Sequence, residues 1–282
     1  MELDGRVAVV TGGTRGVGAG IARAFLRAGA RVVVCARRPP DAPVREAGRA
    51  AVFLPVDLRD PTAVETFFAE VAHRYGRLDT LVNNAGGSPY RLLGEGGAER
   101  HARVLALNLT VPLTVSLAAH GPLRAARGSV VMIGSVSGTR ASPGTAAYGA
   151  AKAGLENLAR SMAVEWAPDV RVNTLVLGMV RTEGSALHYG DAQGVAAVGR
   201  TVPLGRLAEP EEAGEAAVFL ASGRAGYVSG ASLLVHGGGE RPAFLDAATA
   251  GRENRDEHDH RGAGTNGPMG RAGTSGSRGA AG

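Results

Sequence analysis

The segment Thr11-Gly12-Gly13-Thr14-Arg15-Gly16-Val17-Gly18 runs out of a short apolar stretch at residues 6–11 and into a helical pattern at 16–28. Glycines at such a turn permit tight backbone conformations and let a ligand approach the chain closely. The N-terminus of the following helix presents backbone N–H groups to an anion such as a pyrophosphate. Chance glycine turns are common in a chain with 43 glycines. The position of this turn, first in the chain, favours nucleotide binding.

Short apolar segments alternate with amphipathic ones from this turn to about residue 245. The segments rich in β-branched residues are predicted as strands: 6–11, 31–36, 52–56, 80–83, 129–133, 171–176 and 231–235. The periodic segments between them are predicted as helices: 16–28, 61–75, 98–120, 146–166 and 209–220. Apolar strands without alternation indicate a sheet that is covered on both faces. We therefore expect an α/β fold, a single Rossmann-type doubly wound parallel sheet of about seven strands, with ligands beyond the carboxyl ends of the strands.

Composition excludes several classes of protein. Lys and Arg number 31 against 26 Asp and Glu, a net charge of +5, but the basic residues are scattered and predict no nucleic-acid partner. The lone Cys35 excludes a disulfide framework and a cysteine zinc site, and it is predicted to be an inert core thiol. No uninterrupted apolar run approaches the ~18 residues of a membrane span, and the N-terminus lacks the pattern of a signal peptide. We expect a cytoplasmic protein without a metal site.

The chain changes character near its C-terminus. From residue 247 onward it contains no aromatic residue and almost no large aliphatic one. Such a segment buries too little apolar surface to offset the entropy of ordering it. We therefore expect one domain at 1–246 and a disordered tail at 247–282.

Further motifs follow the predicted strands in chain order: Asp57-Leu58, Asn83-Asn84-Ala85-Gly86, Asn108, Ser135, Tyr148-x-x-x-Lys152, Asn173 and Gly178-x-x-x-Thr182. Tyr148 and Lys152 are four residues apart, so a helix places both on one face. An ammonium group near a phenol favours the phenolate and lowers its pKa from about 10 towards neutrality. This pair, with Ser135 at the end of a strand, indicates acid–base chemistry.

These motifs, in this order, resemble those of the short-chain dehydrogenase/reductase family over about residues 4–240. The stretch SVSGTRASPGTAAYGAAKAGL at 135–155 resembles 3-oxoacyl-carrier-protein reductases and their paralogues in particular. The resemblance implies an oxidoreductase that interconverts a ketone and a secondary alcohol by hydride transfer. It leaves the substrate open among sterols, sugars, acyl thioesters and other carbonyl compounds.

The resemblance also implies roles for the residues of the site. Ser135 would hydrogen-bond the substrate oxygen, with Ser137 as the alternative, and Tyr148 would exchange a proton with that oxygen. Lys152 would hold the nicotinamide ribose, and Asn108 would bind a water that links Lys152 to solvent. Asn83 would join neighbouring strands.

A longer set of residues would contact the cofactor: Thr11, Gly12, Thr14, Arg15, Gly16, Val17, Gly18, Arg37, Asp57, Leu58, Asn84, Ala85, Gly86, Tyr148, Lys152, Gly178, Val180 and Thr182. NAD-selective members carry an acid at the end of the second strand, where this chain has Ala36 followed by Arg37. The guanidinium groups of Arg37 and Arg15 suit a 2′-phosphate. We expect NADP(H) to be preferred, with NAD(H) possible.

The chain departs from the family pattern at Leu177, where a proline commonly stands. Leucine leaves the loop beside the nicotinamide freer than proline would. Residues 181–203 take the place of the family's substrate lid. A homo-oligomer, dimer or tetramer, is expected on the long helices 98–120 and 146–166. Two alternatives stay open: an NAD-linked alcohol dehydrogenase, and a nucleotide-binding regulator without catalysis.

Overall fold

The computed structural model describes residues 1–249. Its main sheet consists of β1 (Val7–Thr11), β2 (Arg31–Ala36), β5 (Val52–Pro55), β6 (Thr80–Asn83), β7 (Ser129–Ser135), β8 (Arg171–Leu177) and β9 (Ser232–Val235). These strands lie in the order β5-β2-β1-β6-β7-β8-β9, and every neighbouring pair is parallel. The order reverses direction at β1, as in a doubly wound sheet. The predicted seven-stranded parallel sheet is confirmed.

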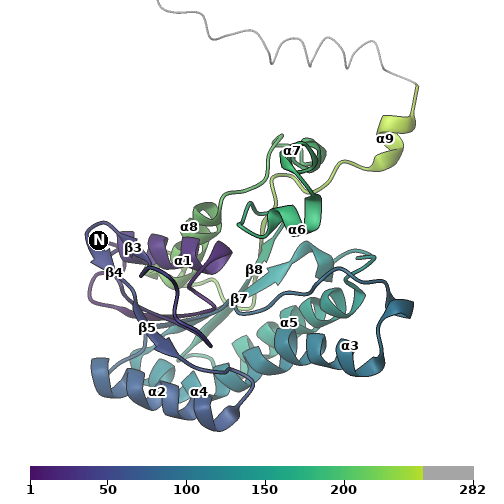
Figure 1. Cartoon of the computed structure of the whole chain (residues 1–282). Coiled ribbons are helices and arrows are strands. Elements are labelled where there is room, and N and C mark those ends of the chain that lie inside the picture. Colours follow the sequence, from purple (N-terminus) through teal and green to yellow (C-terminus); the bar gives the residue numbers. More distant parts are fainter. Residues whose placement is uncertain (250–282) are drawn as a thin grey trace, which may run out of the picture. The chain divides into compact units, whose positions relative to one another are not determined.

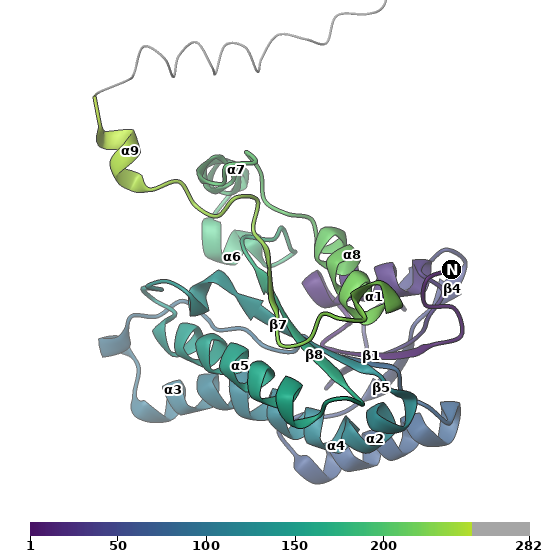
Figure 2. The same ribbon diagram turned by 180° about the vertical axis from the view of Figure 1, so that it is seen from behind.

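Helices cover both faces of the sheet (Figures 1 and 2). The larger ones are α1 (Gly16–Arg27), α2 (Pro61–Tyr75), α3 (Ala98–Leu105), α4 (Val111–Ala126), α5 (Ala146–Glu165) and α8 (Pro210–Ala221). Buried residues of α1 and α8 share one hydrophobic core, and those of α2, α4 and α5 share the other. Burial of both faces explains why the strands are apolar without alternation.

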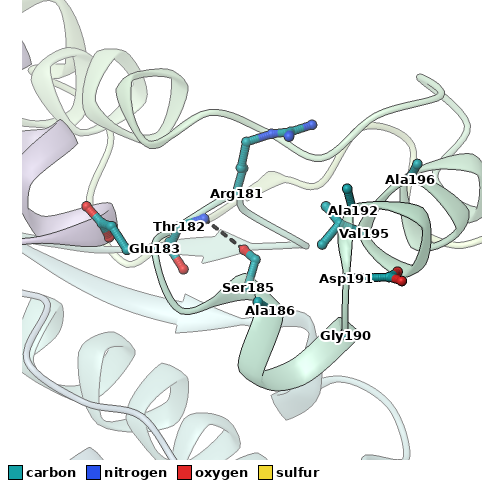
Figure 3. Close-up of a pocket in the computed structure, with 10 residues that line it drawn as sticks. All are labelled: Arg181, Thr182, Glu183, Ser185, Ala186, Gly190, Asp191, Ala192, Val195 and Ala196. Carbon is teal, nitrogen blue, oxygen red and sulfur yellow. Dashed lines mark hydrogen bonds between the residues drawn. The ribbon is translucent and has the colours of Figure 1, made fainter.

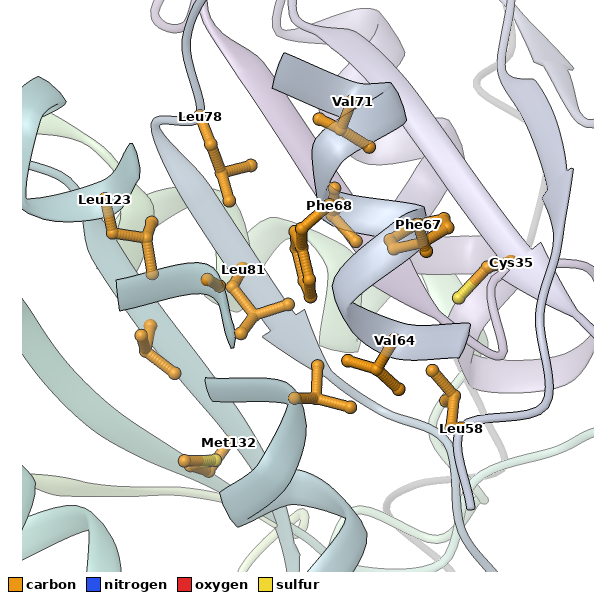
Figure 4. Close-up of a cluster of buried hydrophobic side chains, with 14 of the residues drawn as sticks. Cys35, Leu58, Val64, Phe67, Phe68, Val71, Leu78, Leu81, Leu123 and Met132 are labelled. Carbon is orange, nitrogen blue, oxygen red and sulfur yellow. The ribbon is translucent and has the colours of Figure 1, made fainter. Parts of the chain in front are cut away.

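The core beneath α2, α4 and α5 is drawn in Figure 4. Phe67 and Phe68 of α2 meet edge to face with ring centroids 5.1 Å apart. Cys35 belongs to the same core and is fully buried, as expected, and burial raises the pKa of its thiol to about 12. A thiol that stays protonated in an apolar environment is inert.

Helix ends follow the capping signals in the sequence. Asp60 accepts hydrogen bonds from the N–H groups of Thr62 and Ala63, at 3.0 and 3.3 Å, and Pro61 is the first residue of α2. Glu209 and Glu212 form a capping box at the start of α8. Side-chain capping of the first N–H groups and a proline in the first turn both favour a helix start at these positions.

The helix predicted at 98–120 is present, but it is longer and not regular throughout. It consists of α3, a π-helical turn at Ala106–Thr110, and α4, which continues to Ala126. Pro112 has no N–H to donate to the Asn108 carbonyl four residues earlier, so the regular ladder breaks at this turn.

The stretch Ala98–Ala126 has a window with a mean hydropathy of 1.5 and is long enough to cross a membrane. Its residues Val111, Val115, Ala119 and Leu123 are buried in the hydrophobic core, so in this fold it is a core helix.

Several short elements were not predicted. They are β3 (Arg45–Glu46) and β4 (Arg49–Ala50), which form an antiparallel hairpin, α6 (Ser185–Tyr189), α7 (Ala192–Thr201), α9 (Ala243–Ala247), and 3-10 turns at Leu93–Glu95, Val136–Gly138 and Gly223–Ala225. Most are too short for hydrophobic periodicity to reveal.

Residues 1–240 form one compact unit, and α9 belongs to a second unit that starts at Arg241. The predicted tail at 247–282 lies outside the described residues from 250 onward.

Candidate active site

Ser135, Tyr148 and Lys152 meet at the carboxyl end of β7. Ser135 is the last residue of β7, and its Oγ accepts a hydrogen bond from the Ser137 N–H at 3.2 Å. Tyr148 lies in the first turn of α5, and the side chain of Ser135 is near enough to its phenol to act on the pKa of Tyr148. Lys152 Nζ lies 5.5 Å from the centroid of the Tyr148 ring. The structure therefore brings the three predicted side chains together, with Ser135 rather than Ser137 facing the phenol.

The expected lowering of the Tyr148 pKa by the ammonium of Lys152 is not found. Burial raises the pKa of Tyr148, and the hydrogen bond with Ser135 only partly opposes this effect. Lys152 Nζ donates instead to the Ile133 carbonyl at 2.7 Å. Burial also lowers the pKa of Lys152 to about 8. Its charge is therefore directed at a backbone carbonyl of β7 and not at the phenol oxygen.

Asn108 occupies the π-helical turn and is fully buried. Its Oδ1 accepts from the Gly87 N–H at 2.8 Å, and its Nδ2 donates to the carbonyls of Gly87 and Val104 at 3.0 and 2.9 Å. The side chain therefore fixes the loop after β6. A Cβ on Gly86 would stand 2.6 Å from Asn108 Oδ1 and 3.6 Å from Lys152 Nζ, so glycine is what lets this loop pass between them.

The glycine loop is fastened to the end of β6. Thr11 Oγ1 accepts from the N–H groups of Asn84 and Ala85 at 2.9 and 3.0 Å, and Asn84 Nδ2 donates to the Thr11 carbonyl at 2.8 Å. Asn84 is thus a structural clamp, a role we had expected only of Asn83. Asn83 Nδ2 donates to Ser116 Oγ of α4 at 2.8 Å and contacts Met132 Sδ on β7.

The loop has the close packing that a cofactor cradle requires. A Cβ on Gly18 would lie 2.4 Å from the Gly12 carbonyl oxygen, and one on Gly13 would lie 2.6 Å from Val34. Gly16 has a positive φ of 52° at the start of α1. Its N–H donates to the Glu183 carboxylate, at 3.1 Å to Oε2 and 3.5 Å to Oε1. The Glu183 carboxylate is thus an anion bound at the N-terminus of α1, where we expect the cofactor pyrophosphate. The N–H groups of this loop are therefore suited to bind an anion.

Charged groups gather near the ends of β2 and β5. Ala36 ends β2, and Arg37 after it is exposed. Asp57 Oδ2 accepts from Arg59 Nη2 at 2.6 Å and Oδ1 from Arg59 Nε at 2.9 Å. This hydrogen bonding, with a smaller contribution from Arg37, lowers the pKa of Asp57 to about 2. Arg59 was missed because only the fold shows that its guanidinium returns to Asp57.

Leu177 is the last residue of β8. It is buried and paired in register with Ser135 and Val235. Gly178 follows, and a Cβ there would lie 2.8 Å from His236, so the two strand ends approach closely. The strand is therefore one residue longer than predicted, and the loop begins at Gly178.

The segment after Gly178 leads into residues 181–203, the predicted lid. Val180 forms an isolated bridge with Ala208, and the Thr182 N–H donates to Ser185 Oγ at 2.8 Å. A cavity of about 330 Å³ lies between this segment and α7 and is lined by residues between 181 and 196. Figure 3 draws these lining residues. Ser135 and Tyr148 lie outside this cavity, so it is a feature of the lid.

Most predicted cofactor residues lie at the carboxyl edge of the sheet. The predicted cofactor residues that remain to be placed are Thr14, Arg15 and Val17 in the glycine loop and Leu58 after β5. Ala85, whose N–H binds Thr11, follows β6. Asn173 has another role: its Nδ2 donates to the Val228 carbonyl at 2.8 Å and its Oδ1 accepts from the Ala231 N–H, which positions β9. Glu183 was missed because no spacing connects it with a loop 167 residues away.

Comparison with known proteins agrees with this geometry. A family model described as enoyl-(acyl carrier protein) reductase matches residues 12–240. L-fucose dehydrogenase of Oryctolagus cuniculus is 37% identical over 243 residues, which cover 84% of this chain and 85% of that protein. The 3-oxoacyl-[acyl-carrier-protein] reductase of Vibrio cholerae is 35% identical over 242 residues, or 84% and 98% of the two chains.

A solved structure of a short chain dehydrogenase/reductase family protein superposes with a TM-score of 0.74 at 36% identity, covering 85% of this chain and 99% of that one. The chain belongs to the short-chain dehydrogenase/reductase family and is an NAD(P)-dependent oxidoreductase that acts on CH–OH or C=O groups.

Proposed function

We propose that this chain is a cytoplasmic, NADP(H)-dependent oxidoreductase that interconverts a ketone and a secondary alcohol of a small molecule. The convergence of Ser135, Tyr148 and Lys152 at the carboxyl end of β7 carries the proposal. The glycine loop lies at the same edge of the sheet, two strands away. A substrate oxygen near Ser135 is therefore within reach of a cofactor that is held by the loop.

The chemistry assigns a separate task to each side chain. A bound nicotinamide supplies or accepts the hydride at the carbonyl carbon. Ser135 Oγ hydrogen-bonds the substrate oxygen and orients it, while the Tyr148 phenol donates a proton to that oxygen in reduction and takes it back in oxidation. Lys152 binds the ribose hydroxyls and lies over the Tyr148 ring. Asn108 positions the loop at Gly87 beside this group.

The charges near β2 support a preference for NADP(H). Ala36 places no carboxylate where one would repel a 2′-phosphate, and the exposed guanidinium groups of Arg37 and Arg15 are suited to bind it. We expect kcat/KM with NADPH to exceed that with NADH by at least ~10-fold, about 1.4 kcal/mol.

Steady-state kinetics with both cofactors test this preference. The double variant Ala36→Asp/Arg37→Ala should reverse it, and Arg38→Ala, which removes the neighbouring exposed arginine, serves as the matched control. Equal kcat/KM for the two cofactors in the unmodified protein would contradict the assignment. A strong preference for NAD⁺ in alcohol oxidation would favour the alternative, an NAD-linked alcohol dehydrogenase. Absence of turnover with any carbonyl or alcohol would favour the regulator without catalysis.

The chemistry of Ser135 and Tyr148 narrows the class of substrate. Two hydroxyl groups that lie together can both hydrogen-bond one substrate oxygen. This arrangement suits a carbonyl or hydroxyl group better than the carbon–carbon double bond that an enoyl reductase reduces. An assay panel of a 3-oxoacyl thioester, an enoyl thioester and a cyclic ketone distinguishes these reactions. Reduction of the enoyl thioester alone would contradict the proposal.

A further inference from the structure

A charged pair joins the segment that follows Ser135 to the segment that follows β9, and the proposed mechanism does not use it. Arg140 lies in the segment between β7 and α5, five residues after Ser135. Glu240 follows the glycine run that comes after β9. Arg140 Nη2 forms an ion pair with Glu240 Oε1. Because β7 and β9 are the two neighbours of β8, this pair joins segments from both sides of the β8 end, where the lid begins.

A phenol from the lid lies close to the same pair. Tyr189 is the last residue of α6 and is half-buried. Its pKa is raised by burial and then by the negative charge of Glu240, while the positive charge of Arg140 lowers it. Tyr189 in turn contributes to raising the pKa of Tyr148. The phenol of Tyr189 is therefore within electrostatic range of both the charged pair and the acid–base residue.

The pair retains groups that can bind a ligand. The side chains of Arg140 and Glu240 are 40% and 35% exposed, and such pairs stabilise a fold by only ~0–1 kcal/mol. Arg140 Nη1 donates to the Ala141 carbonyl at 2.9 Å, which uses another of its five N–H groups and leaves the rest for other acceptors. A carboxylate also has more acceptor positions than one guanidinium contact uses.

The charge balance indicates a neutral ligand. Arg140 and Glu240 compensate each other, so a substrate carboxylate that approached Arg140 would also meet the repulsion of Glu240. Of the other charges at 181–203, Arg181 is paired with Glu209 at 3.2 Å, and Glu183 accepts from the Gly16 N–H. Asp191 accepts from the Gly194 N–H at 2.9 Å, and Arg200 is exposed near the end of α7. Neighbouring hydroxyl groups meet no such conflict, because one can donate to Glu240 while the other accepts from Arg140 or Tyr189.

We propose that Arg140, Tyr189 and Glu240 form a polar subsite that binds vicinal hydroxyl groups of a neutral, polyhydroxylated substrate. This inference rests on the proposed function, since it requires that the reacting carbon lie at Ser135 and Tyr148. The subsite selects the part of the substrate that does not react. It therefore determines specificity, and Arg140 and Glu240 act as its donor and its acceptor.

Oxidation kinetics with three matched alcohols test the subsite: cyclohexanol, cyclohexane-1,3,4-triol, and 3-hydroxycyclohexanecarboxylate, each with NADP⁺ and with NAD⁺. We expect the triol to have a kcat/KM at least ~10-fold above that of cyclohexanol, from one or two good hydrogen bonds. Arg140→Leu and Glu240→Leu should each reduce this ratio to near one. Tyr189→Phe should reduce it less, because it removes one hydroxyl.

Arg74→Leu is the matched control, because Arg74 forms a comparably exposed pair with Glu70 on α2. It should leave the ratio unchanged. Equal kcat/KM for the triol and cyclohexanol in the unmodified protein would overturn the subsite and leave the oxidoreductase function intact. A preference for the carboxylated alcohol that Arg140→Leu abolishes and Glu240→Leu increases would overturn it in favour of an anionic substrate. Failure to oxidise any of the three alcohols with either cofactor, together with turnover of the 3-oxoacyl thioester, would overturn the subsite alone. No turnover of these alcohols, of the corresponding ketones or of the 3-oxoacyl thioester would contradict the proposed function and the subsite with it.

Discussion

Single residues at this site are held by contacts that leave them little freedom. The side chains of Asn108, Asn84 and Thr11 hydrogen-bond the backbone of neighbouring loops. Lys152 is buried and bonded to a carbonyl of β7. A site that acts on a small molecule needs such fixation, because its reacting groups must already be in place when the substrate binds.

At the residue scale, Tyr148→Phe should lower kcat by about 10²- to 10⁴-fold, since it removes the proton that is exchanged with the substrate oxygen. The cofactor Kd should change little, because the ring remains. Stopped-flow or steady-state assays give kcat, and fluorescence titration with NADPH gives the Kd. Retention of more than about a tenth of the wild-type rate would mean that another group transfers the proton.

Lys152 gives a prediction for the pH dependence of stability. Burial lowers its pKa to about 8, whereas in the unfolded chain the pKa is 10.5. Between these values the unfolded chain binds more protons, so the free energy of unfolding rises with pH across this window. The gain relative to Lys152→Met should reach about 3 kcal/mol above pH 10.5.

The measurement is thermal unfolding of the cofactor-free wild type and Lys152→Met at pH 7, 8, 9 and 10. The wild type should gain stability relative to the variant as pH rises. A difference that is constant over this range would show that Lys152 titrates normally.

Sequence patterns located the candidate acid–base residues but not the partners of other site residues. Tyr148 and Lys152 were predicted from their spacing on one helix, which is a local property. The contact between Arg59 and Asp57 depends on a side-chain rotamer, and the pair formed by Arg140 and Glu240 depends on where β9 lies in the sheet. Neither leaves a periodic signal in the sequence.

At the scale of elements, the strands and long helices were predicted because their apolar patterns extend over several turns or residues. The lid was predicted as a segment, but its helices α6 and α7 were not. The π-helical turn at Asn108 was missed although Pro112 signals it, because the surrounding pattern is continuous with a helix. Leu177 extends β8 by one residue beyond the predicted strand at 171–176.

The contact between Glu183 and the glycine loop predicts that the Glu183 carboxylate competes with a cofactor phosphate for the Gly16 N–H. The Glu183 carboxylate lies on the Gly16 N–H that a cofactor phosphate would bind, so binding must displace it. Glu183→Gln should therefore tighten the Kd for NADP⁺ by about 2- to 5-fold, equivalent to ~0.3–1 kcal/mol for a charge at a helix N-terminus. Calorimetric titration measures the effect. Glu99→Gln, which removes an exposed acid from the first turn of α3, is the control. Unchanged or weaker binding by Glu183→Gln would argue against the competition.

At the scale of residues 1–240, the parallel sheet explains why distant motifs form one site. The ends of β1, β2, β5, β6, β7 and β8 all lie at the same edge, so the motifs that follow them come together whatever their separation in the chain. The same sheet leaves the outer faces of α4 and α5 to be covered by something else or by water.

Those outer faces lead to the last prediction, that of a homo-oligomer. Leu117 of α4 is 59% exposed and Val164 of α5 is 80% exposed, although their helices pack into the core on the opposite side. Apolar side chains on the faces of two long helices are typical of a surface that is buried between copies of a chain. Leu117→Arg should therefore lower the molar mass measured by light scattering after size exclusion, since it places a charge in that surface. Ala69→Arg, on the exposed face of α2, should not change the mass. A monomeric wild-type protein, or equal masses for wild type and Leu117→Arg, would contradict an interface on α4.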